Sequence, residues 1–148
     1  MNTGLMMPLV IMLVAGVCIA TQAPINAQLG RFSGDTMSAA MLSFAVGLVV
    51  LVILVSLRGA MPTLSALKAA PWWVWIGGAL GAFYVWGATF SVQKIGVVAT
   101  ISALILGQLV GGAIIDAAGA FDVPVKSIDL RRVAAVAFVG IGVFLSVT

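Results

Sequence analysis

Long apolar stretches alternate with short polar connections along the whole chain, and every charged residue lies outside the stretches. The middle three stretches are about 21 residues long, so as helices each would cover about 31 Å, close to the hydrocarbon thickness of a bilayer. This pattern predicts helices that cross a membrane. The five stretches are Leu5–Ala20, Met37–Leu57, Trp72–Val92, Ile95–Ile115 and Val133–Val147.

The first and last stretches can cross a bilayer only if their helices continue into polar sequence. The first helix is expected to run on through Gln22 and Asn26, with Pro24 removing one backbone hydrogen bond. The last is expected to begin near Asp129, whose carboxylate can cap the free amide groups of a helix start. The sequence therefore predicts an all-α integral membrane protein, with five transmembrane helices forming a single domain over residues 1–148.

The composition limits the chemistry that the chain can support. Of its 148 residues 63% are apolar and only 7% are charged, far below the roughly 25% of soluble domains. There is no histidine and no glutamate, and Cys18 lies within the first apolar stretch. We therefore expect no metal, no cofactor and no enzyme activity. The net charge of +3 comes from scattered cations, so nucleic acid is not an expected partner.

The cations in the connections predict the orientation, because positive charge favours the cytoplasmic side. With five spans, five cations lie on the side of the N-terminus and two, Arg31 and Lys94, on the other. The five are Arg58, Lys68, Lys126, Arg131 and Arg132. The expected arrangement is a multi-pass protein with a cytoplasmic N-terminus. Because the difference is only three cations, insertion in both orientations remains open.

The connection before the third span carries features of a membrane interface. Trp72, Trp73 and Trp75 follow a proline, and such rings favour the headgroup region. Leu64 and Leu67 stand at helical spacing, which predicts a short interfacial helix.

Uncharged polar residues inside the spans are costly unless they find partners or line water, so their positions indicate function. Gln22 and Asn26 share one face of the first helix. Tyr84 stands among small residues of the third span, and Gln108 lies in the fourth. We predict that these groups line a cavity that binds a small solute. The candidate substrate-binding residues are Gln22, Asn26, Tyr84, Gln108, Gly77 and Gly81.

The alternative is that the same polar groups only form hydrogen bonds between packed helices. Gly107 and Gly111 lie four residues apart and predict close packing of the fourth helix, with a dimer partner as the leading expectation. Asp116, at the end of that helix, is expected to be solvated or paired with a connection cation such as Lys126. Arg132 is expected to reach outward to the membrane interface.

Several segments, in order along nearly the whole chain, resemble the YdcZ family. They are the run from Gln22 to Arg31, Ser43-Phe44 with Gly47, Gly77-Gly78 with Gly81 and Tyr84, and Gly107-Gln108 followed by Asp116 and Gly119. The family is placed in the drug/metabolite transporter superfamily. The resemblance implies an exporter of the bacterial inner membrane.

The resemblance also implies the assembly. A five-helix unit is half of a ten-helix transporter whose halves are inverted repeats, so a lone unit needs an oppositely inserted partner. That partner would be a second copy or an oppositely oriented paralogue, in an antiparallel dimer. By similarity to the small multidrug resistance proteins, Gln22 falls near the place of their central glutamate. An amide in that place disfavours coupling to protons.

These features favour a small-solute transporter of the lipid bilayer. A non-transporting scaffold or accessory subunit is the alternative. A pore is less favoured, since no continuous polar stripe runs through any span.

Overall fold

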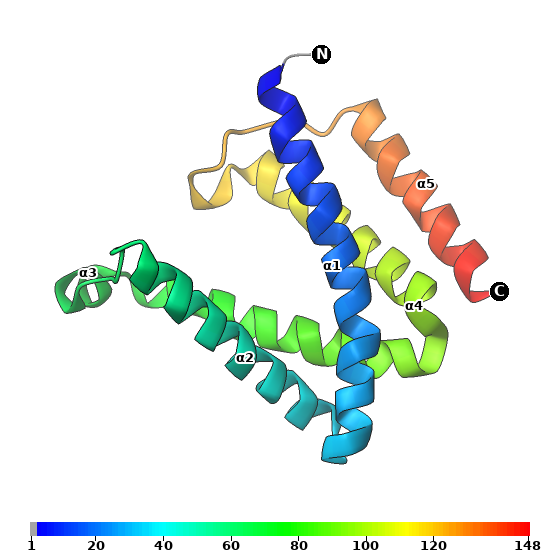
Figure 1. Cartoon of the computed structure of the whole chain (residues 1–148). Helices are drawn as coiled ribbons and strands as arrows, with labels where there is room; N and C mark the ends of the chain where they lie inside the picture. The colour runs from blue at the N-terminus through cyan, green and yellow to red at the C-terminus, as the bar shows by residue number, and fades with distance from the viewer. Residues whose placement is uncertain (1–2) are drawn as a thin grey trace. The chain divides into compact units, whose positions relative to one another are not determined.

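The computed structural model describes residues 3–148, with side chains from Met6 onward, and this part of the chain is helical without a strand. Figure 1 shows the elements in order: α1 Thr3–Ser33, α2 Thr36–Leu57, α3 Leu64–Ala69, the 3₁₀ helix η1 Trp72–Trp75, α4 Ile76–Ala118, the 3₁₀ helix η2 Ala120–Asp122 and α5 Leu130–Val147. Segments long and apolar enough to cross a membrane are Met6–Ser33, Thr36–Leu57, Trp72–Ala118 and Leu130–Val147. The prediction of an all-α chain with long apolar helices is confirmed.

The third of these segments contains both spans that the sequence predicts as separate. Trp72–Ala118 has 47 residues, and a straight helix of that length would measure about 70 Å, more than twice the hydrocarbon thickness. Gly96, with φ 76° and ψ 175°, is not helical and interrupts α4. The break lies close to Lys94, where the sequence predicts the connection. Among the described residues there are thus four candidate spanning segments, one of them interrupted.

The chain divides into two compact units, residues 1–93 and residues 94–148. The N-terminal unit holds α1, α2, α3, η1 and the first part of α4. The C-terminal unit holds the rest of α4, η2 and α5. The single five-span domain stays a prediction.

Helix α1 continues through the polar sequence that follows the first apolar stretch. It extends from Thr3 to Ser33 and includes Pro8 and Pro24 within its length. Each proline removes one backbone donor, a loss that a membrane helix tolerates where neighbouring groups compensate. The predicted extension is confirmed, and it places Gln22 and Asn26 on a regular helix.

Small side chains form the core of the N-terminal unit. Close approach is clear at Gly30, where an added Cβ would lie 3.6 Å from the Thr36 Cα atom. Packing of this kind is typical of membrane helices, because small residues allow backbones to gain dispersion contacts. The buried residues of this core are Ala23, Asn26, Ala27 and Gly30 of α1, Ala39 and Ala40 of α2, and Val85 and Thr89 of α4.

Asp35 lies in the short turn after α1 and is the N-cap residue of α2. Its Oδ2 accepts a hydrogen bond from the Ser38 backbone N–H at 2.8 Å and another from the Ser38 hydroxyl at 3.1 Å. The backbone N–H groups of Ser38 and then Met37 hold the pKa of the Asp35 carboxyl below its ordinary value. The ionised form therefore stabilises the folded chain.

We expect acid to weaken this cap. A lowered folded-state pKa gives stability that is fully present above the ordinary aspartate pKa of about 3.9 and is lost as pH falls through the lower pKa of the folded chain. Asp35→Asn should keep the cap but lose this part of the pH dependence, whereas Asp35→Ala should lower the melting temperature at neutral pH as well. Thermal unfolding in detergent between about pH 2 and 7 measures both. If the melting temperatures of the wild type and Asp35→Asn fell equally at acid pH, the Asp35 carboxylate would not be the source of this pH dependence.

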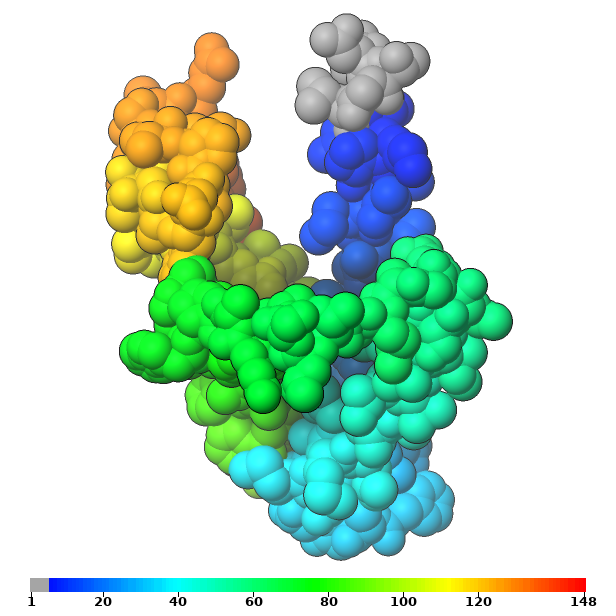
Figure 2. Space-filling model, turned by 90° about the vertical axis from the view of Figure 1, so that its left-hand side faces the viewer, coloured from blue at the N-terminus to red at the C-terminus, as the bar shows by residue number. Residues whose placement is uncertain are grey.

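The segment from α3 to η1 lies at the surface of the N-terminal unit. Thr63 caps α3 by accepting a hydrogen bond from the Ala66 backbone N–H at 3.3 Å. Trp72, Trp73 and Trp75 are all exposed, and Figure 2 shows this segment, in green, on the face toward the viewer. The predicted short helix is confirmed, and exposed indole rings suit the membrane interface.

The C-terminal unit pairs the second part of α4 with α5. Asp129 caps α5 as predicted, because its Oδ1 accepts a hydrogen bond from the Arg132 backbone N–H at 2.9 Å. Further along, a Cβ at Gly140 would lie 4.0 Å from the Leu106 side chain. The two helices therefore lie side by side along part of their length (Figure 1).

Candidate functional site

Gln22 and Asn26 line two different cavities of the N-terminal unit. Gln22 is half-buried and lines a cavity of about 290 Å³ between α1, α2 and the first part of α4. The other residues that line it are Ser43, Phe44, Gly47, Leu48, Leu51 and Val85. Apart from Gln22 and Ser43, this lining offers no polar side chain.

Asn26 is the most deeply placed amide of the described residues, with 3% of its surface exposed. It lines a cavity of about 660 Å³ between α1 and α2, whose lining is otherwise apolar except for Ser43. No hydrogen bond among the described residues involves its side chain, yet no fully buried polar atom of that part of the chain lacks a partner. The Asn26 amide therefore keeps its access to the cavity and is available to a ligand.

Ser43 lines both cavities and was not a candidate site residue in the sequence. It lies within the first half of α2, and its sequence neighbours are apolar, so the sequence gives no periodic polar pattern that includes it. The only signal for it was the Ser43-Phe44 pair among the motifs of the family resemblance. The side chains that line the two cavities in the N-terminal unit include no carboxylate.

Tyr84, Gly77 and Gly81 lie on the first part of α4. Tyr84 is half-buried, and an added Cβ at Gly81 would lie 3.5 Å from the Phe44 ring, so α4 approaches α2 closely there. At Gly77 no atom lies within 4 Å of an added Cβ. Gly81 thus serves close packing, whereas Gly77 borders open space.

Several hydroxyl groups of the spans are satisfied within their own helices. Thr21, Thr89 and Thr100 each donate to the carbonyl four residues earlier, at 2.8, 2.7 and 2.7 Å. These hydroxyl groups are therefore not used to join one helix to another. That pattern gives no support to the view that polar groups serve mainly as links between helices.

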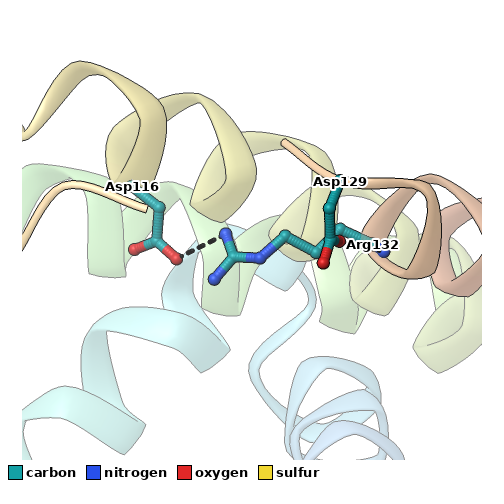
Figure 3. Close-up of polar contacts among 3 residues, drawn as sticks. All are labelled: Asp116, Asp129 and Arg132. Carbon is teal, nitrogen blue, oxygen red and sulfur yellow. Dashed lines mark hydrogen bonds and ion pairs between the residues drawn. The ribbon is translucent and has the colours of Figure 1, made fainter. Parts of the chain in front are cut away.

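Gln108 belongs to a third cavity, which lies within the C-terminal unit. This cavity has a volume of about 280 Å³ and also contains Asp116 of α4 and Arg132 of α5. The Arg132 Nη1 atom donates to the Asp116 Oδ2 atom at 2.9 Å (Figure 3), with 31% and 29% of the two side chains exposed. The remaining lining residues are Leu109, Gly112, Ala113, Ala135 and Val136.

This ion pair identifies the connection cation that pairs with Asp116. Asp116 pairs with Arg132 rather than with Lys126, whose backbone N–H instead donates to the Asp116 backbone carbonyl at 2.9 Å. The Arg132 side chain accordingly turns toward α4. The reason is that the first turn of α5 lies beside the end of α4, a juxtaposition that the sequence does not reveal.

The structure thus brings Gln22 and Asn26 to neighbouring cavities that share Ser43, and it places Gln108 beside an ion pair. A single cavity lined by all the predicted residues stays a prediction. Gly107 and Gly111 have no atom within 4 Å of an added Cβ. Among residues 3–148 no three His, Cys, Asp or Glu side chains are grouped as a metal site requires, and Cys18 is exposed.

Comparison with known proteins gives two matches. A family model described as "Putative inner membrane exporter, YdcZ" matches residues 7–145. The chain is similar to the Inner membrane protein YdcZ of Escherichia coli (strain K12), with 27% identity over 121 residues that cover 81% of each protein. No solved structure matches the chain.

Proposed function

Because the chain belongs to the YdcZ family, we propose that it exports a small solute across the bacterial inner membrane. One observation carries the proposal: Asn26 is nearly fully buried, forms no hydrogen bond among the described residues and faces a cavity of about 660 Å³. A purely structural amide would be expected to bond a neighbouring helix, since an unpaired buried amide is costly. A solute would supply the missing partner.

In this proposal α4 provides two spans. The interruption at Gly96 divides the 47-residue apolar segment into parts that are each about long enough for a bilayer. The protein then has five spans with its termini on opposite sides, and it represents half of a drug/metabolite transporter fold.

We further propose that two such units work as an antiparallel dimer, with either a second copy or an oppositely oriented paralogue. In each candidate span at most 11% of the most apolar window is buried within the chain, which leaves ample surface for a partner and for lipid. The open positions at Gly107 and Gly111 would allow a second helix to approach closely. An odd number of spans is what an inverted arrangement requires.

The cavity side chains of the N-terminal unit argue against coupling to protons there. They offer the amides Gln22 and Asn26 and the hydroxyl of Ser43, with no carboxylate among them. Donors and acceptors of this kind suit a polar solute without requiring an ionisable group. Tyr84 and Gly77 line neither of these two cavities and stay candidates for the site from the sequence.

Flux measured in liposomes that contain only this protein tests the proposal. Saturable efflux of small polar solutes supports a transporter, and flux near channel rates would instead indicate a pore. Absence of flux for a broad panel of metabolites, with the protein folded, would favour a scaffold or accessory subunit.

The orientation can be tested by altering the distribution of positive charge. The expected split is five cations to two, so adding two lysines after Lys94 makes it five to four and should increase the fraction of inverted chains. Single cysteines introduced into connections on either side of the membrane, in a Cys18→Ser background and labelled in intact cells, measure that fraction. Two added glutamines at the same place are the control. An unchanged fraction would contradict marginal insertion and favour an oppositely charged paralogue as the partner.

A further inference from the structure

We propose that the C-terminal unit carries a binding site for a small zwitterion, a solute with one ammonium and one carboxylate group, between Asp116 and Arg132. The inference rests on the proposed transport function and names a solute class for it. Its residues differ from those of the two N-terminal cavities, and only Gln108 was a candidate from the sequence.

The ion pair forms part of a cavity wall. The Arg132 Nη1 and Asp116 Oδ2 atoms are 2.9 Å apart (Figure 3). Both residues line a cavity of about 280 Å³, and close to a third of each side chain remains exposed. Both charges are therefore accessible from the cavity. A pair with this access can exchange its internal contact for contacts to a solute.

The backbones that carry the two charges are held by other bonds. The Asp116 carbonyl accepts from the Lys126 backbone N–H at 2.9 Å, and the Arg132 backbone N–H donates to Asp129 at 2.9 Å. Neither bond involves the ion pair. The long Arg132 side chain can therefore move away from Asp116 while α4 and α5 stay in place.

The charges select the solute class. A simple cation would bind Asp116 and leave Arg132 without its partner, and a simple anion would leave Asp116 alone, which is unfavourable away from bulk water. A zwitterion places its carboxylate on Arg132 and its ammonium on Asp116, so one ion pair becomes two and the total charge stays balanced.

The remaining walls suit a small solute. Gly112, Ala113 and Ala135 leave space, while Leu109 and Val136 offer apolar contact. The Gln108 amide supplies a donor and an acceptor for one more polar group.

Equilibrium binding to the purified full-length protein in lipid nanodiscs tests the proposal, with glycine, L-alanine and L-serine as probes. Methylammonium and acetate each carry one of the two charges and serve as solute controls. We expect the zwitterions to bind at least about tenfold more tightly than either control, the scale of one charge-assisted hydrogen bond. Equal or absent binding of the zwitterions would overturn the proposal.

The matched variants are Arg132→Gln and Arg131→Gln, which remove one charge from neighbouring residues of the same helical turn. Arg131 is exposed and lies outside the cavity lining. Arg132→Gln should weaken zwitterion binding at least about tenfold, and Arg131→Gln should not. If Arg132→Gln fails to fold, the double variant Asp116→Asn with Arg132→Gln leaves no unpaired charge and should show the same loss. Unchanged binding in either would overturn the site.

Flux in liposomes separates this inference from the proposed function. Zwitterion binding without flux of any solute would support the site and contradict transport. Zwitterion flux that survives in the double variant would support transport and overturn the site.

Discussion

Replacing Asn26 by leucine is expected to reduce solute flux at least about tenfold while leaving the protein as stable as before or more stable. The amide is 3% exposed and has no hydrogen-bond partner among the described residues, so its removal breaks no internal bond. Leucine suits the apolar lining formed by Leu29, Leu42 and Val46. The free energy of unfolding should therefore stay the same or rise by about 1 kcal/mol. A solute that bonds the amide would lose at least one hydrogen bond.

Gln28→Leu is the matched control, because it removes an exposed amide from the same helix outside the cavity. This variant should transport normally. If Asn26→Leu instead destabilises the chain by about 0.6 kcal/mol or more, the scale of a hydrogen bond between membrane helices, the amide joins helices and the site proposal fails.

Replacing Gly96 by alanine is expected to lower the free energy of unfolding by about 1 to 3 kcal/mol. Its φ of 76° with ψ of 175° lies in a region of backbone space that residues with a Cβ avoid. No atom lies within 4 Å of an added Cβ, so the penalty comes from the backbone and not from a clash. Unfolding in mixed detergent micelles measures the change.

Gly87→Ala is the control for this variant, since Gly87 lies within α4 and also borders open space. It should leave stability unchanged or raise it, because alanine favours helix more than glycine does. Equal effects of the two substitutions would show that the chain is regular helix at Gly96, and the division of α4 into two spans would then fail.

Local sequence signals located most of the helices. The apolar stretches, the carboxylate before α5 and the spacing of Leu64 and Leu67 each act over a few residues, which is why they could be recognised without a structure. A break in α4 was predicted near Lys94, because one apolar stretch ends at Val92 and the next begins at Ile95. The backbone angles of Gly96 show that the break lies at this residue. A glycine in the sequence does not by itself indicate such angles, because glycine also occurs within regular helix.

The candidate site depends on contacts between helices, so the sequence predicted only part of it. It identified Gln22, Asn26 and Gln108, because an amide within an apolar helix is conspicuous wherever that helix packs. It did not identify Ser43, whose importance comes from lying between two cavities.

Hydrophobic length and the cost of buried amides are properties of single segments. The amino-acid sequence was therefore enough to identify a set of membrane-spanning helices with a few polar groups inside them. The pairing of Arg132 with Asp116 instead of Lys126, and the position of Asn26 at a cavity between α1 and α2, became known from the folded chain alone. The physical reason is that charge pairing and cavity shape depend on which helix faces lie together. Small residues such as Ala39 and Gly30 allow α1 and α2 to pack closely. This packing depends on both helices and cannot be deduced from either one alone.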